Sequence, residues 1–182
     1  FRLTSKMILK SFSKINLSLS VNKKMKNRLH GIQSYFCLLN LFDEIKIKKH
    51  NEKKDIIKFK GKFAKYVNNR KNSISYTLAI LRKWNVINNY YSVIIQKKIP
   101  VFAGLGGGTS NAAYLVKYFI KKKIDKNLLD NLKKNVGSDL KLFFNNQGFL
   151  KNLETVIHFK KNYKLYFLLI YPNIRSSTKH VY

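Results

Sequence analysis

The chain has 182 residues, of which 45% are hydrophobic and 14% aromatic, enough for one folded domain or for one domain and part of another. The 37 basic and 8 acidic residues give a formal net charge of +29. No apolar run approaches the roughly 20 residues of a membrane span, and the basic N-terminus lacks a signal-peptide pattern. The single Cys37 excludes an internal disulfide and suits a reducing compartment, so we predict a cytoplasmic protein.

The positive charge has two interpretations. A field of this sign attracts phosphates, which is typical of nucleic-acid-binding proteins. Alternatively, the charge reflects a lysine-rich composition, because the lysines are spread along the whole chain and arginine, the usual reader of bases, is scarce. We favour the second interpretation and do not predict a nucleic-acid partner.

The first half of the chain predicts strands and one helix. Residues 14–21, KINLSLSV, alternate strictly and predict a half-buried strand with Lys14 and Asn16 on its polar face. Residues 31–40 place apolar side chains at helical spacing and predict a helix. Residues 43–49 and 55–63 are predicted to be strands with alternating lysines.

The second half predicts a helix at 72–84 with Asn72 as its N-cap, a β-branched strand at 90–99, and helices at 109–120 and 125–136. A strongly apolar strand is predicted at 163–173. Because strands and helices are mixed without regular alternation, the sequence favours an α+β fold over a doubly wound sheet.

Four glycines lie within five residues between the predicted strand at 90–99 and the helix that follows. Pro100 ends the strand, and bare backbone then meets the first turn of a helix, which offers unpaired N–H groups and partial positive charge. This combination predicts a cradle for a phosphate-bearing ligand, with hydroxyls from Thr109 and Ser110 for a phosphate oxygen or a metal ion. The alternative is a tightly packed corner between helix and strand. The glycines concerned are Gly104, Gly106, Gly107 and Gly108.

The glycine pattern does not fit two common phosphate-binding motifs. No lysine follows the glycines as a P-loop requires, and position 109 is Thr where G-x-G-x-x-G needs a third glycine.

Asp139 stands out among the eight carboxylates. It follows Gly137 and Ser138 and precedes an apolar stretch, which predicts a partly buried carboxylate at the start of an element. The alternative role is a helix N-cap. The sequence contains no Cys and His cluster for a metal ion and no Ser–His–Asp spacing, and Cys37 is predicted to lie in the core.

PVFAGLGGGTSNAA resembles the P-x-x-x-G-L-G-[GS]-[GS]-[ST]-S-x-A-A loop of the GHMP kinases. SFSKINLSLSV, LHGIQSYFCLLNLFDEI, VGSDLKLFF and YPNIRSSTKHVY are similar, in this order, to motifs of the 4-diphosphocytidyl-2-C-methyl-D-erythritol kinases within that superfamily. The resemblance implies an ATP-binding N-terminal domain at 7–158, a mixed sheet with helices on one side. It also implies the first strand of a truncated ferredoxin-like C-terminal domain at 159–182, after a non-native leader at 1–6. An incomplete chain of this kind is expected to turn over poorly.

The same resemblance implies an ATP-dependent kinase that phosphorylates the 2-hydroxyl of 4-diphosphocytidyl-2-C-methyl-D-erythritol in the non-mevalonate isoprenoid pathway. Asp139 would be the general base, and Lys14 would keep it ionised and neutralise transition-state charge. Mg²⁺ would bridge the ATP phosphates next to Ser110. The implied nucleotide contacts are Asn72, Pro100, Gly104, Leu105, Gly106, Gly107, Gly108, Thr109 and Ser110.

For the acceptor substrate, the resemblance implies contacts from Asn16, His30, Thr178 and Tyr182, with Tyr182 stacking on the cytosine. Leu29 stands where the family has a tyrosine that stacks on the second face of this base. This difference leaves open another small-molecule kinase of the superfamily, and the net charge of +29 leaves open a basic RNA-binding module of related fold.

Overall fold

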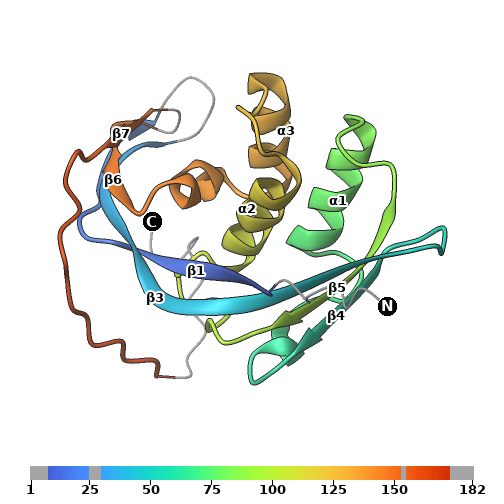
Figure 1. Ribbon diagram of the computed structural model, residues 1–182. Coiled ribbons are helices and arrows are strands. Elements are labelled where there is room, and N and C mark those ends of the chain that lie inside the picture. Colours follow the sequence, from blue (N-terminus) through green and yellow to red (C-terminus); the bar gives the residue numbers. More distant parts are fainter. Residues whose placement is uncertain (1–7, 25–29, 153–154, 173–182) are drawn as a thin grey trace.

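A computed structural model describes residues 8–24, 30–152 and 155–172. Strand β3 is the spine of a mixed sheet of order β4–β5–β3–β6–β7, and β1 and β2 also pair with β3. Helices α1, α2 and α3 lie together on one face of this curved sheet (Figure 1). The predicted α+β class, with a mixed sheet covered by helices on one side, is therefore confirmed. The strands are β1 (Ile8–Asn16), β2 (Ser20–Lys24), β3 (His30–His50), β4 (Ile56–Lys60), β5 (Tyr90–Gln96), β6 (Gln147–Leu150) and β7 (Val156–His158); the helices are α1 (Ser73–Lys83), α2 (Gly107–Phe119) and α3 (Lys126–Val136), with 3-10 helices η1 (Ala64–Tyr66) and η2 (Ser138–Phe144).

The helix predicted at 31–40 is wrong, because these residues belong to β3. β1 pairs antiparallel with one edge of β3, from Asn16 opposite Phe36 to Ile8 opposite Lys46. β5 and β6 pair with the other edge. Aromatic and branched side chains suit a strand that is paired on both edges, and this tertiary pairing outweighs the helical spacing of the apolar residues.

The strand predicted at 14–21 is split, because β1 ends before residues 17–19 and β2 begins after them. Hydroxyl groups contribute to the bonding at the break. The Ser34 hydroxyl donates to the Ser18 carbonyl (2.6 Å), and the Ser18 hydroxyl accepts from the Tyr35 N–H (3.1 Å). These side-chain bonds supplement a backbone bond at the break, from the Leu17 N–H to the Tyr35 carbonyl (2.7 Å).

The core lies between the sheet and the helices. Helix α1 buries Ile74, Leu78 and Leu81, and helix α2 buries Ala112, Leu115 and Val116. No helix in the described ranges is both long and apolar enough to cross a membrane. The main cluster of buried side chains includes Ile45, Ile74, Leu78, Leu81, Val93, Ile95, Leu115, Val116, Leu128, Leu132, Leu140 and Phe143.

Cys37 lies in the buried part of β3, as predicted, with 2% of its surface exposed. Burial raises the pKa of its thiol above the ordinary value. Because the thiolate is the reactive form, we expect the thiol reagent DTNB to modify native protein far more slowly than urea-unfolded protein. Rapid stoichiometric modification of the native protein, followed by absorbance, would contradict this placement.

The strand predicted at 163–173 is wrong over residues 163–172, which form no ladder with another described segment. The Gln147 side chain bonds to this backbone, accepting from the Tyr163 N–H (2.8 Å) and donating to the Tyr163 carbonyl (2.5 Å). The apolar pattern of residues 163–172 is typical of a strand buried on both faces, but no strand in the described ranges pairs with them. The domain boundaries at 7–158 and 159–182 stay predictions, and 1–6 and 173–182 lie outside the described residues.

Candidate functional site

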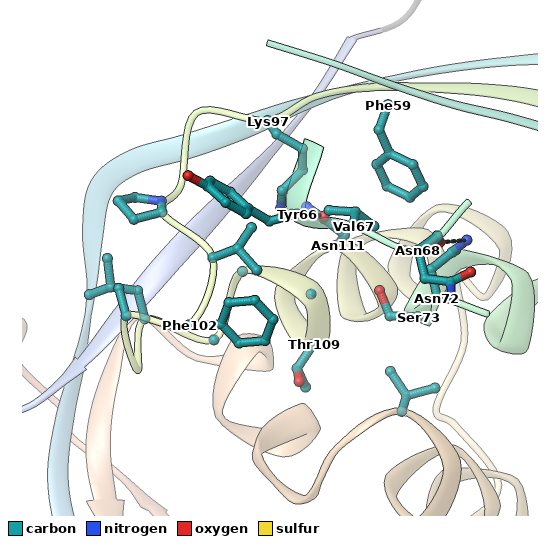
Figure 2. Close-up of a pocket in the computed structure, with 18 of the residues that line it drawn as sticks. Phe59, Tyr66, Val67, Asn68, Asn72, Ser73, Lys97, Phe102, Thr109 and Asn111 are labelled. Atoms are coloured by element: carbon teal, nitrogen blue, oxygen red, sulfur yellow. Dashed lines mark hydrogen bonds between the residues drawn. The ribbon is translucent and has the colours of Figure 1, made fainter. Parts of the chain in front are cut away.

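Residues 100–109, here called the glycine loop, connect β5 to α2 and line a pocket of about 460 Å³. Residues 66–73, between η1 and the start of α1, form the opposite wall, with Phe59 above them (Figure 2). The volume falls in the range of small-molecule sites, roughly 300–1,000 Å³. The predicted nucleotide contacts that line the pocket are Asn72, Pro100, Gly104, Leu105, Gly106, Gly107, Gly108 and Thr109.

Packing accounts for two of the four glycines. Gly106 is the N-cap of α2, with φ +67°, and a Cβ there would lie 2.7 Å from Cζ of Phe143. A Cβ on Gly107 would lie 3.0 Å from Cγ2 of Ile99. At these two positions the close helix–strand corner considered above is present.

Packing does not account for the other two glycines. Gly104 has φ +71° but nothing within 4 Å of its Cβ position, so only its backbone conformation requires glycine. At Gly108 the nearest atom is the Ser73 hydroxyl oxygen at 3.6 Å. Both Gly108 and Ser73 line the pocket, so a side chain at position 108 would fill pocket space that the protein leaves open.

The N-terminus of α2 meets this open space. Its first turn contains no acidic residue, so no side-chain carboxylate there offsets the partial positive charge of the helix end. Bare backbone beside an uncompensated helix N-terminus is an arrangement that binds phosphate groups.

Lys14 of β1 and Asp139 of η2 form an ion pair, with Nζ and Oδ2 3.1 Å apart. The Lys14 ammonium also donates to Oδ1 of Asn16 (3.1 Å), so three predicted site residues come together. Lys14 is 5% exposed, whereas the Asp139 side chain is 37% exposed and open to a substrate. Asp139 is not a helix cap, because η2 begins after Gly137 without a side-chain capping bond.

The ion pair adjoins the glycine loop but does not line the pocket. The Lys14 N–H donates to the Leu105 carbonyl (3.0 Å), and Cγ of Lys14 lies 3.3 Å from the Cβ position of Gly106. The pair therefore contacts the loop at Leu105 and Gly106, two residues that themselves line the pocket.

Ser110 is fully buried, and its hydroxyl donates to the Phe12 carbonyl (2.6 Å) and lies 2.7 Å from the Ser11 hydroxyl. These bonds direct the side chain toward β1 and away from the pocket. The predicted metal contact of Ser110 is therefore not supported, and Thr109 is the hydroxyl residue of the loop that lines the pocket. The described residues contain no group of three His, Cys, Asp or Glu that could hold a metal ion.

Asn72 caps α1, as the sequence predicted. Its Oδ1 accepts from the Ser75 N–H (2.9 Å), and its Nδ2 donates to the carbonyls of Asn68 (3.1 Å) and Asn69 (3.3 Å). Both ends of the amide therefore hold the pocket wall at 66–73. Its predicted contact with adenine stays a prediction.

Replacing Asn72 by Ala is expected to lower the free energy of unfolding by about 1 kcal/mol, because an N-cap bond is lost, and to weaken ATP binding, because the pocket wall loosens. Urea titration and calorimetry measure the two effects. Asp125→Ala removes the N-cap of α3, which accepts from Asn127 and Leu128, and serves as the control. It should cost similar stability without changing ATP affinity; equal losses of ATP affinity in both variants would contradict a role for the wall.

The predicted acceptor contacts can be placed only in part. Asn16 lies beside Lys14, and His30 opens β3, although its side chain is not described. Leu29, Thr178 and Tyr182 lie outside the described residues. Sequence reasoning missed Lys97, which lines the pocket, because one lysine has no distinguishing signal in a lysine-rich chain.

No family model matches the chain. The 4-diphosphocytidyl-2-C-methyl-D-erythritol kinase of Pelagibacter ubique is 37% identical over 179 residues, which cover 96% of this chain and 63% of that protein. The kinase of the same name from Ureaplasma parvum is 34% identical over 191 residues, covering 97% of this chain and 68% of that protein. The chain thus spans about two thirds of the length of these curated relatives.

Solved structures share the fold. A crystal structure of 4-(cytidine 5'-diphospho)-2C-methyl-D-erythritol kinase superposes with a TM-score of 0.67 at 22% identity, covering 97% of this chain and 63% of that one. The mevalonate kinase of Methanococcus jannaschii superposes with a TM-score of 0.58 at 17% identity, covering 87% and 57%. With its sequence relatives above 30% identity over nearly its whole length, the chain belongs to the 4-diphosphocytidyl-2-C-methyl-D-erythritol kinase family.

Proposed function

We propose that the protein is an ATP-dependent kinase that transfers the γ-phosphoryl group to the 2-hydroxyl of 4-diphosphocytidyl-2-C-methyl-D-erythritol, in the cytoplasm and on the route to isoprenoid precursors. The observation that carries the proposal is the bare backbone at Gly108, which leaves pocket space for a phosphate tail. The Lys14–Asp139 pair contacts the same loop at Leu105 and Gly106. A phosphate site and a base thus adjoin one loop. The relatives' names supply the substrate.

The roles follow from position and charge. The N–H groups at the start of α2 hold the phosphates. Asp139 accepts the proton of the acceptor hydroxyl as that oxygen bonds to the γ-phosphorus, while the bond from the γ-phosphorus to the bridging oxygen breaks and ADP leaves with that oxygen. The buried Lys14 ammonium holds the Asp139 carboxylate in place and neutralises charge that develops in the transition state. Asn16, which accepts from this ammonium, lies where it can hold the acceptor.

Oxygen ligands suited to Mg²⁺ are present beside the loop. The Asp139 carboxylate and the Thr109 hydroxyl would hold the ion, whereas Ser110 points toward β1. When bound, Mg²⁺ would neutralise charge on the phosphates.

Phosphorus NMR of the purified protein with ATP and candidate acceptors tests the proposal. We expect a new phosphate ester on cytidine-linked methylerythritol and none on polyols that lack the cytidine. Phosphorylation of plain polyols would favour another GHMP kinase activity instead. If every acceptor were left unmodified while RNA bound tightly with a steep salt dependence, the kinase proposal would fail in favour of an RNA-binding module.

Gly108→Ala is expected to separate stability from binding. A methyl group at position 108 makes only an ordinary van der Waals contact, 3.6 Å from the Ser73 hydroxyl oxygen. Because alanine is also the better helix former, the free energy of unfolding should stay equal or rise by up to about 1 kcal/mol. ATP affinity should nevertheless fall about tenfold, which corresponds to 1.4 kcal/mol, because the methyl group occupies the pocket. Urea titration and calorimetry give the two quantities; unchanged ATP affinity would mean that the phosphates lie elsewhere.

A further inference from the structure

Beneath the glycine loop lies a group of polar side chains that the proposed chemistry does not use, here called the buried cluster: Ser11, Asp43, Lys97 and Asn111. Its members come from β1, β3, the end of β5 and α2, and each is at most 3% exposed. Figure 2 shows Lys97 and Asn111 next to one another at the edge of the pocket. Charged groups are rarely buried to this extent without a specific partner.

Asp43 joins the two ends of the glycine loop. Its Oδ1 accepts from the N–H groups of Lys98 (2.7 Å) and Ile99 (2.9 Å), the residues that lead into the loop. Its Oδ2 accepts from Nδ2 of Asn111 (3.0 Å), two residues after the loop, and from the Lys97 ammonium. One carboxylate on β3 therefore fixes where the loop begins and where it ends.

Lys97 is a pocket residue as well as the partner of Asp43. Its ammonium donates to Asp43 and to Oδ1 of Asn111 (3.1 Å), which uses two of its three N–H bonds. The nitrogen lies 3.4 Å from the Cβ position of Gly107, the first residue of α2, and Lys97 lines the pocket. Asp43 thus holds the Lys97 ammonium at the N-terminus of α2, where phosphates would bind.

The buried cluster continues to β1. Nδ2 of Asn111 donates to the Ser11 hydroxyl (3.0 Å), which lies 2.7 Å from the Ser110 hydroxyl. A buried ion pair adds little net stability compared with well-packed apolar residues, so stability alone does not account for such a pair below the pocket.

We propose that Asp43 and Lys97 are positioning residues for the nucleotide's phosphates. Asp43 fixes both ends of the glycine loop and holds the Lys97 ammonium beside the first residue of α2. The inference rests on the proposed function, in which this pocket binds the phosphate tail of ATP.

The double variant Asp43→Asn/Lys97→Met tests the proposal without leaving an unpaired buried charge. The Asn carbonyl can still accept from Lys98 and Ile99, while the ammonium is lost. Glu44→Gln/Lys98→Met is the matched control, because it removes the neighbouring ion pair, whose side chains are 29% and 45% exposed, with the same change in net charge. Calorimetry at one salt concentration gives the dissociation constants for ATP and adenosine, and urea titration gives the stability of each variant.

We expect the buried double variant to bind ATP at least about tenfold more weakly while adenosine affinity changes less than about twofold, and the control to bind both as before. Equal ATP affinity in the folded double variant would overturn the inference, and so would equal losses for ATP and adenosine. Failure of the unsubstituted protein to bind ATP would instead overturn the proposed function, and the inference with it.

A second measurement needs no substitution and stays decisive if the double variant fails to fold. The buried Lys97 ammonium can be followed by nitrogen NMR in the unsubstituted protein. We expect its resonance to shift on addition of ATP and to stay in place on addition of adenosine. An unmoved resonance under saturating ATP would overturn the inference.

Discussion

Replacing Asp139 by Asn is expected to lower phosphoryl transfer by about 10²–10⁴-fold, the usual contribution of a general base. The amide has the same shape and can still accept a bond from Lys14, which lies 3.1 Å from the carboxylate, but it cannot take the acceptor proton at neutral pH. ATP affinity should stay within a few-fold, because the glycine loop and the N–H groups at the start of α2 hold the phosphates in the proposed mode of binding. Single-turnover kinetics and calorimetry measure the two quantities.

Asp130→Asn is the control for this prediction. It removes the same charge from an exposed carboxylate on α3, 3.5 Å from Lys133, and should leave transfer unchanged. Transfer by the Asp139→Asn protein at the unsubstituted rate would exclude Asp139 as the base. RNA binding, if that were the function, should be unaffected or slightly stronger in both variants, because each loses one negative charge.

Gly106→Ala is expected to cost the most stability among the loop substitutions. Its φ of +67° strains any L-residue by roughly 1–2 kcal/mol, and overpacking in a filled core adds about 1–3 kcal/mol. The added Cβ would lie 2.7 Å from Phe143 and 3.3 Å from Lys14, so both of these side chains must move. Urea titration should show a large loss of stability, and phosphoryl transfer should fall with it.

Gly104→Ala separates the cost of backbone strain from the cost of overpacking. Its φ of +71° is almost the same as that of Gly106, but nothing lies within 4 Å of its Cβ position. It should therefore lose only the conformational part, roughly 1–2 kcal/mol. If the two variants lost equal stability, the contact of Gly106 with Phe143 would not be the reason for glycine there.

Elements with local signals were predictable from the sequence. Helix α1 has its own capping box at Asn72, and α2 follows a glycine loop that ends β5, so neither depends on distant residues. Residues 43–49 of β3 were correctly predicted as a strand, whereas residues 31–40 were wrongly predicted as a helix. The apolar residues of 31–40 happen to fall at helical spacing, and the stability of the strand comes from partners on both edges that lie far away in the chain. The strand predicted over residues 163–172 was wrong for a different reason. Their apolar pattern predicts a strand, but the described part of the chain offers no partner strand for it.

The candidate site was predictable to a similar degree. Alternation along β1 predicted that Lys14 and Asn16 share a face, and the structure places them in contact. Ser110 was misplaced because α2 begins at Gly107, two residues earlier than expected, which directs the fourth residue of the helix toward β1. The Asp43–Lys97 contact joins positions 54 residues apart, and no local pattern distinguishes such a pair among many lysines.

Strand β1 is bonded to the glycine loop and to the helix after it, through Lys14 to Leu105 and through Phe12 to Ser110. Any adjustment of the loop around a triphosphate would therefore pass directly to the strand that carries the Lys14 ammonium, through the Leu105 carbonyl and the Ser110 hydroxyl. For this reason we expect ATP and the acceptor substrate to bind cooperatively. Each should raise the affinity for the other by the same factor, as linkage requires.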